Sequence, residues 1–154
     1  MAVQPLQVAR LEGMPSVPLE HGEEGTGTQT WIKGSVLIFN GQRLDEAATE
    51  PVDNIMGLAL APAEGTDDAD VMYVPITSDI IFEGNIGTSV TVGDIAADDM
   101  NALYPLALSG TDWFVDKTDN NQPTVRVIRF RDAVGTTNGR VYFKFLESTL
   151  AYTN

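Results

Sequence analysis

From Trp31 onward the sequence is divided into short apolar and β-branched runs separated by turn-forming residues. The runs include GSVLIF (34–39), VMYVPIT (71–77), DIIFEGNI (79–86) and GRVYFKFL (139–146). About eight such runs, with turn signals roughly every 8 to 12 residues, are typical of a small barrel or sandwich. Only the stretch 95–102, after a capping candidate in Asp94, indicates a helical turn. We therefore expect an all-β fold: a small β-barrel or sandwich of about eight short strands with an extended N-terminal arm and at most one short helix.

The run at 36–39 is apolar on both faces of the strand that it would form. Such a strand is expected to be covered on both sides, by the chain's own core or by a neighbouring subunit. The dipeptide Asn40-Gly41, which follows it, favours a tight hairpin. A second tight turn is expected at Ser78-Asp79, between the runs 71–77 and 79–86.

Residues 1–30 differ from the rest of the chain, and we assign them to an extended N-terminal arm, with the β-domain covering 31–154. The segment holds three prolines, four glycines and the tract GTGTQT, and neither helical nor strand periodicity persists in it. A disordered tail usually carries fewer apolar residues than this one. We interpret it as an arm whose apolar side chains enter pockets on a partner; the alternative is a frayed terminus. The predicted contact residues are Val3, Leu6, Val8, Leu11, Met14, Val17 and Leu19.

The chain is strongly acidic, with 22 Asp and Glu against 9 Lys and Arg and a net charge of −13. Such a charge repels polyanions, so nucleic acid is not expected as a partner. No apolar run approaches the ~20 residues that span a bilayer, and the N-terminus lacks the pattern of a signal peptide. The absence of cysteine excludes disulfides and thiol chemistry. We expect synthesis in a cytoplasm and no membrane partner.

No pattern in the sequence indicates an active site or a cofactor site. His21 lies in the predicted arm, where a catalytic base would lack a rigid support, and no GxSxG is present. Asp67, Asp68 and Asp70 lack the spacing of a calcium loop, and we interpret EGTDDAD (64–70) as a solvated acidic loop. The same interpretation applies to Asp94, Asp98 and Asp99. We therefore expect a protein that is not an enzyme and needs no metal or cofactor.

The segment VRVIRFRDAVGTTNGRVYFKF (125–145) carries five of the nine basic residues. Strict strand alternation places Arg126 on one face and Arg129 and Arg131 on the other, so the cations would not line one side. The same alternation turns Phe143 and Phe145 inward, with Tyr142 and Lys144 outside. That is a poor platform for single-stranded nucleic acid. We favour docking onto an acidic protein partner over nucleic-acid binding or ordinary surface charge, through Arg126, Arg129, Arg131, Arg140 and Lys144.

The order of four segments resembles a known family. DNIMGLALAPA, VMYVPITSDIIFEGNI, DWFVDKT and VRVIRFRDAVGTTNGRVYFKF follow one another as in the capsid decoration (cement, or head-stabilising) proteins of tailed double-stranded DNA bacteriophages. The likeness covers about residues 35–147. Its most specific part is the turn formed by Asp132, Val134, Gly135, Thr136, Asn138, Gly139, Arg140 and Val141.

The resemblance implies a structural role. It implies a protein on the outer surface of the capsid, commonly a homotrimer, that binds the major capsid protein and clamps adjacent subunits against the pressure of the packaged DNA. On this view the basic side chains pair with carboxylates of the shell or of sister subunits. Two alternatives stay open: another virion component, such as a tail or baseplate spacer, and an oligonucleotide- or carbohydrate-binding β-barrel.

Overall fold

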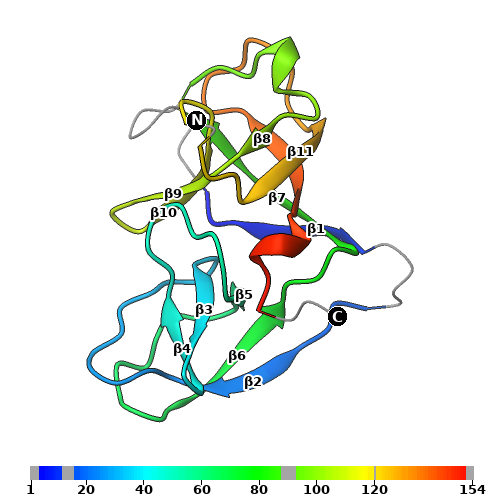
Figure 1. Cartoon of the computed structure of the whole chain (residues 1–154). Helices are drawn as coiled ribbons and strands as arrows, with labels where there is room; N and C mark the ends of the chain where they lie inside the picture. The colour runs from blue at the N-terminus through cyan, green and yellow to red at the C-terminus, as the bar shows by residue number, and fades with distance from the viewer. Residues whose placement is uncertain (1–3, 12–15, 88–92, 120, 152–154) are drawn as a thin grey trace.

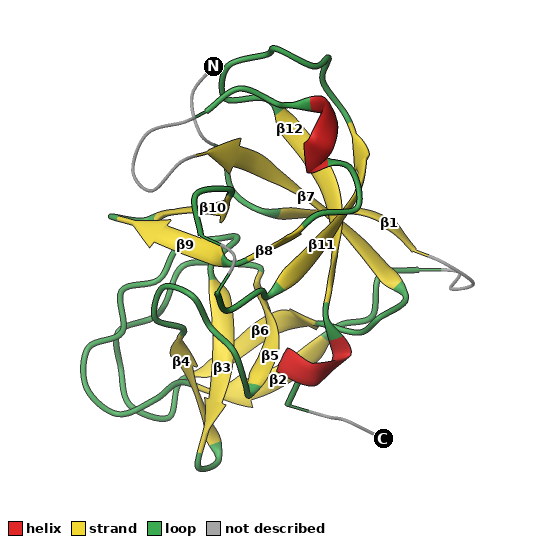
Figure 2. Ribbon diagram, turned by 45° about the horizontal axis from the view of Figure 1, so that its top comes forward, coloured by secondary structure: helices red, strands yellow, loops and turns green. Residues whose placement is uncertain are grey.

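The computed structural model describes residues 4–11, 16–87, 93–119 and 121–151, and the regular structure within them is almost entirely β-strand (Figures 1 and 2). The all-β prediction is confirmed. Two short 3-10 turns, η1 (Ala97–Asp99) and η2 (Glu147–Thr149), are the exceptions. The strands are β1 (Gln7–Leu11), β2 (Glu20–Glu23), β3 (Val36–Asn40), β4 (Arg43–Glu46), β5 (Ile55–Ala59), β6 (Asp70–Pro75), β7 (Ile80–Gly87), β8 (Leu103–Tyr104), β9 (Leu106–Ser109), β10 (Asp112–Asp116), β11 (Val125–Phe130) and β12 (Arg140–Phe145).

The strands form two sheets, of which the larger is organised around β7. Its order is β8-β11-β12-β7-β10-β9, and β1 also pairs with β7. β12 lies antiparallel along one edge of β7, with Tyr142 opposite Glu83. The other edge is shared by β1, which is antiparallel, and β10, which pairs in parallel near the end of β7. This arrangement makes β7 the most enclosed strand, and all eight of its residues are buried.

The smaller sheet has the order β2-β6-β5-β3-β4 and nearly closes into a barrel. The closing contact is made after β2, where Gly25 N donates a hydrogen bond of 2.9 Å to Leu44 O of β4. β3 and β4 form the expected hairpin, with Asn40 paired to Arg43 across a loop that contains Gly41 at φ 74°. Glycine readily adopts this positive φ, and the central residues of the turn are Gly41 and Gln42, one position later than the expected Asn40-Gly41.

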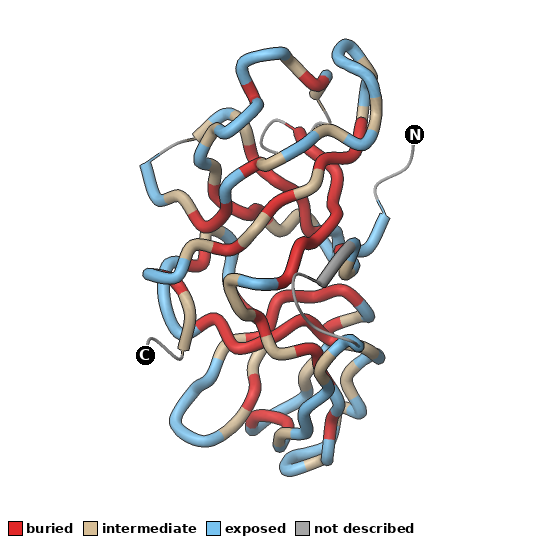
Figure 3. The backbone as a smooth tube through the Cα atoms, turned by 90° about the vertical axis from the view of Figure 1, so that its right-hand side faces the viewer, coloured by how far each residue is buried: buried red, intermediate tan, exposed pale blue. Residues whose placement is uncertain are grey.

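The main core lies where the two sheets face each other. Strand β3 is buried on both of its sides, in two different clusters. Val36 packs in the main core between the sheets, while Leu37 packs in a second cluster inside the small sheet, with Trp31 and Tyr73. The sequence-based prediction of a strand covered on both faces is therefore confirmed for these two residues, by the chain's own core. Figure 3 shows buried segments concentrated in the middle of the molecule, with exposed loops at either end.

Three phenylalanines dominate the large-sheet side of this core. Phe82 of β7 lies 5.2 Å from Phe145 and 6.1 Å from Phe143 of β12, measured between ring centroids. The Phe82–Phe145 pair is edge-to-face, a geometry that aromatic rings favour. The prediction that Phe143 and Phe145 point inward is confirmed, since they are 0% and 3% exposed.

The N-terminal segment is part of the fold, and this corrects the predicted division at residue 30. β1 pairs with β7 of the large sheet, and β2 pairs with β6 of the small sheet. Residues 4–11 and 16–30 are therefore not an arm that projects from a separate domain. Their strands were missed because no two-residue periodicity marks them; their pairing is determined by the open edges of β7 and β6, which lie far away in the sequence.

Two local expectations also differ from the structure. The tight turn expected at Ser78-Asp79 is present, but the two strands that it joins do not pair, because β6 belongs to the small sheet and β7 to the large one. The turn between them therefore links the sheets. The helical turn expected over 95–102 is limited to η1, and its cap is not Asp94. Asp99 accepts a hydrogen bond of 2.7 Å from Ala96 N, while Asp94 accepts one from the Thr137 hydroxyl.

Asp99 also produces a testable pH dependence. Burial, and then the hydrogen bond of 2.8 Å that Tyr104 Oη donates to Asp99, raise the pKa of Tyr104 above its ordinary value of about 10. Above that pH the unfolded chain binds fewer protons than the folded chain, so the stability of the fold should fall as the pH rises further. We expect Tyr104→Phe to lose less stability than the wild type between pH 9 and 11.5, as measured by urea denaturation. Equal slopes for the two proteins would contradict this.

Candidate partner-binding face

A β-bulge in β11 brings Arg126 and Arg129 to the same face of the large sheet. The register pairs Arg126 with Lys144 and Arg129 with Tyr142, and it shifts between Val127 and Arg129. Ile128 is the extra residue. Strict alternation had placed Arg126 and Arg129 on opposite faces, and that interpretation is wrong because a bulge reverses the alternation after it. The outer face of this hairpin carries Arg126, Arg129, Tyr142 and Lys144 together.

A second bulge lies on β1, between Val8 and Arg10, and Ala9 is its extra residue. Ala9 and Ile128 both line a surface groove of about 190 Å³, together with Ile81, Arg129 and Tyr142. Strand β1 lies beside β7 and β11 lies beside β12, so the two bulges flank the β7–β12 pair. The extra residue of each bulge lines the same groove. Bulges often re-aim side chains beside functional sites. We call this surface the β1–β11 groove.

The cations around the groove differ in how they are held. Arg126 is exposed, and within the described part of the chain it reaches Asn101 O alone, at 3.4 Å. Lys144 is half-buried. Arg129 is exposed, and among the residues that the structure describes its guanidinium has no hydrogen-bond or ion-pair partner. Arg129 is therefore the cation at this groove that is best placed to meet a carboxylate from outside.

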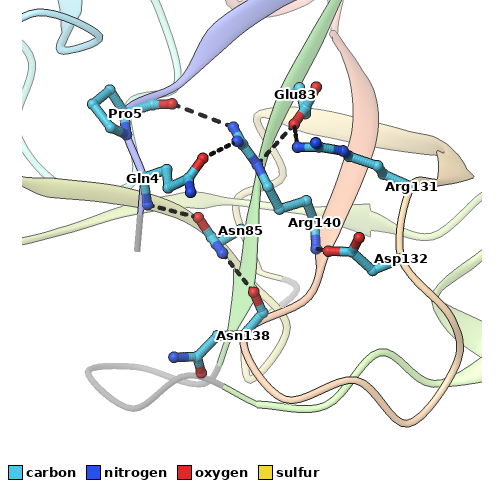
Figure 4. A network of polar contacts seen from close by, with 8 residues as sticks. All are labelled: Gln4, Pro5, Glu83, Asn85, Arg131, Asp132, Asn138 and Arg140. Atoms are coloured by element: carbon cyan, nitrogen blue, oxygen red, sulfur yellow. Dashed lines mark hydrogen bonds and ion pairs between the residues drawn. The ribbon is translucent and has the colours of Figure 1, made fainter. Parts of the chain in front are cut away.

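Arg131 and Arg140 have another role, because both pair with the buried carboxylate of Glu83 (Figure 4). Arg140 Nε lies 2.9 Å from Glu83 Oε1, and the Arg140 side chain is only 4% exposed. Burial lowers the pKa of Arg140, and the charge of Glu83 opposes that effect. Arg131 reaches the same carboxylate oxygen from the loop after β11. One carboxylate thus serves two guanidinium groups.

The same network fixes the N-terminal segment to the large sheet (Figure 4). Arg140 donates hydrogen bonds to Gln4 Oε1 and Pro5 O, and Asn85 Oδ1 accepts a bond of 2.9 Å from Gln4 N. Asn85 in turn donates to Asn138 O at 2.6 Å. Arg140 is therefore committed to internal contacts, which corrects its prediction as a partner-binding residue. Arg131 is 44% exposed and keeps a free side, but its first partner is Glu83.

The predicted contact residues of the arm lie in three different environments. Leu6 is 2% exposed and belongs to the chain's own core, so its prediction as a partner contact is wrong. Val8 is half-buried and packs against the same core. Val17 and Leu19 are exposed, at 40% and 54%, and remain candidates. Val3, Met14 and the side chain of Leu11 lie outside the described residues.

The acidic loop at 64–70 is held by contacts to other parts of the chain. Buried Glu24 accepts hydrogen bonds of 2.8 Å from both Glu64 N and Gly65 N. At the far end of the loop, Asp68 pairs with Arg43 and Asp70 with His21. Within residues 4–11, 16–87, 93–119 and 121–151, no three His, Cys, Asp or Glu side chains gather as metal ligands would. The loop is thus anchored by ordinary hydrogen bonds and ion pairs.

The groove itself was missed by sequence reasoning. Its apolar lining comes from three strands, and neither Ala9 nor Ile81 has any local feature that indicates a surface site. The single available signal was the run Val127-Ile128, two adjacent β-branched residues that interrupt the alternation of apolar and basic positions. Such an interruption is typical of a bulge. Tyr142 had been assigned correctly to the outer face.

Among the described residues, no helix is both long enough and apolar enough to cross a membrane. No protein-family model matches the sequence, and a search of curated proteins finds no match.

Proposed function

We propose that this chain is a structural protein of a tailed double-stranded DNA phage, which binds the outer surface of the capsid and clamps adjacent subunits of the major capsid protein. In this role it acts as a homotrimer and catalyses no reaction. The proposal extends the resemblance of segment order over about residues 35–147. It places the mature protein on the virion, after synthesis in the bacterial cytoplasm.

One observation supports the proposal: the outer face of the large sheet gathers basic side chains. In a chain of net charge −13, the β11–β12 hairpin collects cations on one face, and Arg129 has no partner there among the described residues. A free surface normally balances its charges, so a concentrated basic patch on an acidic protein favours an acidic partner. Val17 and Leu19, two exposed residues just before β2, offer apolar side chains for further contacts with the partner. Many weak contacts, repeated over a shell, add up to firm attachment.

The test is addition of the purified chain to expanded phage heads that lack it. We expect the protein to co-sediment with the heads up to a fixed number of copies, and decorated heads to keep their DNA at temperatures at which bare heads release it. Heads that have not expanded provide the control. Protein that stays in the supernatant, or that labels tails and not heads in immunogold images, would overturn the proposal.

A second candidate is binding of single-stranded nucleic acid, and the bulge at Ile128 is the observation that favours it. The bulge places Tyr142 on one face with Arg126, Arg129 and Lys144, a combination that strict alternation had excluded. Stacking platforms combine aromatic and cationic side chains in this way. Filter binding of a 20-nucleotide single strand across a salt series decides the matter. An affinity that falls steeply with salt supports this candidate.

A further inference from the structure

We infer that the β1–β11 groove is a docking site for an extended acidic segment of a protein partner, which places an apolar side chain in the groove and a carboxylate on Arg129. The inference deepens the proposed function and rests on it for the partner, since such a segment would belong to the major capsid protein. The groove itself is defined by this chain alone.

The shape of the groove suits one side chain of a larger partner. Its volume of about 190 Å³ lies below the ~300–1,000 Å³ typical of pockets for small molecules. Ala9, Ile81 and Ile128 supply its aliphatic lining, and Tyr142 and Arg129 its polar lining. An apolar anchor in a small pocket, with polar contacts at the rim, is the usual arrangement of a protein–protein hot spot.

The charges around the groove determine which residues should flank that anchor. Arg129 and Arg126 are exposed, and Arg126 makes a single long hydrogen bond to the residues that the structure describes. An incoming carboxylate can form a bidentate pair with the Arg129 guanidinium, which gives both strength and orientation. Glu83 sits in register with Tyr142, but Arg131 and Arg140 already neutralise it. It therefore does not repel an acidic segment.

Nucleic acid fits this groove less well than a peptide does. Its lining is mainly aliphatic, whereas single strands bind by stacking bases on aromatic rings, and among the described residues Tyr142 is the one ring that lines it. A strand of phosphates would also approach a chain of net charge −13. A short segment with two or three carboxylates needs only the local cations.

The experiment uses the full chain and a fluorescein-labelled peptide in which aspartate and glutamate alternate with leucine. Anisotropy titrations compare the wild type, Arg129→Glu and Lys33→Glu, the last being an exposed site that does not line the groove, with the same change in charge. We expect Arg129→Glu to bind at least tenfold more weakly and Lys33→Glu to bind within twofold of the wild type. A peptide with serine in place of leucine should bind the wild-type protein at least tenfold more weakly than the leucine peptide does. Thermal melting of each variant shows that the fold is intact.

Several results would overturn the inference. If Arg129→Glu bound the peptide as tightly as the wild type does, the groove would not be the site that binds the peptide. Tighter, Arg129-dependent binding of a 20-nucleotide single strand would assign the groove to nucleic acid. A wild-type oligomer that Arg129→Glu converts to monomers would assign it to a second copy of the chain.

Head binding by the same variants separates this inference from the proposed function. If Arg129→Glu fails to bind the peptide but still binds heads, the inference about the groove is contradicted and the capsid role is not. If the wild type binds the peptide through Arg129 but does not bind heads, the capsid role is contradicted and the inference about the groove is not. If Arg129→Glu binds neither the peptide nor the heads, while Lys33→Glu binds both, the groove inference and the capsid role are both supported.

Discussion

Replacing Glu83 with glutamine is expected to lower the free energy of unfolding by about 3–5 kcal/mol, the cost of removing one member of a buried ion pair. The substitution keeps the shape of the side chain and removes its charge. Arg140, which is 3% exposed, then keeps its buried guanidinium without its ion-pair partner. Arg131 loses the same partner. Urea denaturation followed by tryptophan fluorescence measures the change.

The matched control is Glu23→Gln, an exposed carboxylate on strand β2, which should change the stability by less than about 0.5 kcal/mol. A second consequence follows from the contacts of Arg140. Because Arg140 also holds Gln4 and Pro5, its disturbance should raise amide hydrogen exchange in β1. A loss of less than about 1 kcal/mol for Glu83→Gln would show that the carboxylate is well solvated, and the description of a buried network would then be incorrect.

The strands of this fold could be predicted from the sequence where local pattern and burial agree. In β12, Val141, Phe143 and Phe145 alternate with polar residues, and all three point into the core. The run 36–39 was expected to be covered on both faces, and this holds for Val36 and Leu37, which pack into two separate clusters, but not for Phe39, which is 38% exposed. In both cases the side-chain period reports directly on which face meets the core.

The features that build the candidate site could not be predicted in this way, because they depend on pairing between distant strands. The extra residue Ile128 changes the face of Arg129, and it becomes recognisable only once the register against β12 is known. Arg140 looked like a rim cation, yet its burial arises from Gln4 and Pro5, more than 130 positions earlier. Likewise, β1 forms because β7 offers an open edge, and its own sequence has little strand character.

The second large effect is expected at Leu6, where substitution by alanine should lower the free energy of unfolding by about 2–5 kcal/mol. Leu6 is 2% exposed and packs in the main core. Gly84 of β7 makes room for it: a Cβ atom at that position would lie 2.5 Å from Leu6 Cδ2. Such close packing means that a smaller side chain leaves a cavity that the neighbouring strands cannot easily fill. Urea denaturation again gives the measurement.

Leu19→Ala is the control, since Leu19 belongs to the same N-terminal segment but is 54% exposed. It should alter stability by less than about 0.5 kcal/mol. The two variants separate the two roles that an apolar N-terminal residue can have. If Leu6 holds the fold and Leu19 meets a partner, Leu6→Ala unfolds more easily, while Leu19→Ala folds normally and binds heads more weakly. If Leu6→Ala were as stable as the wild type and failed only in head binding, the N-terminal segment would be an arm for a partner, and the pairing of β1 with β7 in the free chain would be wrong.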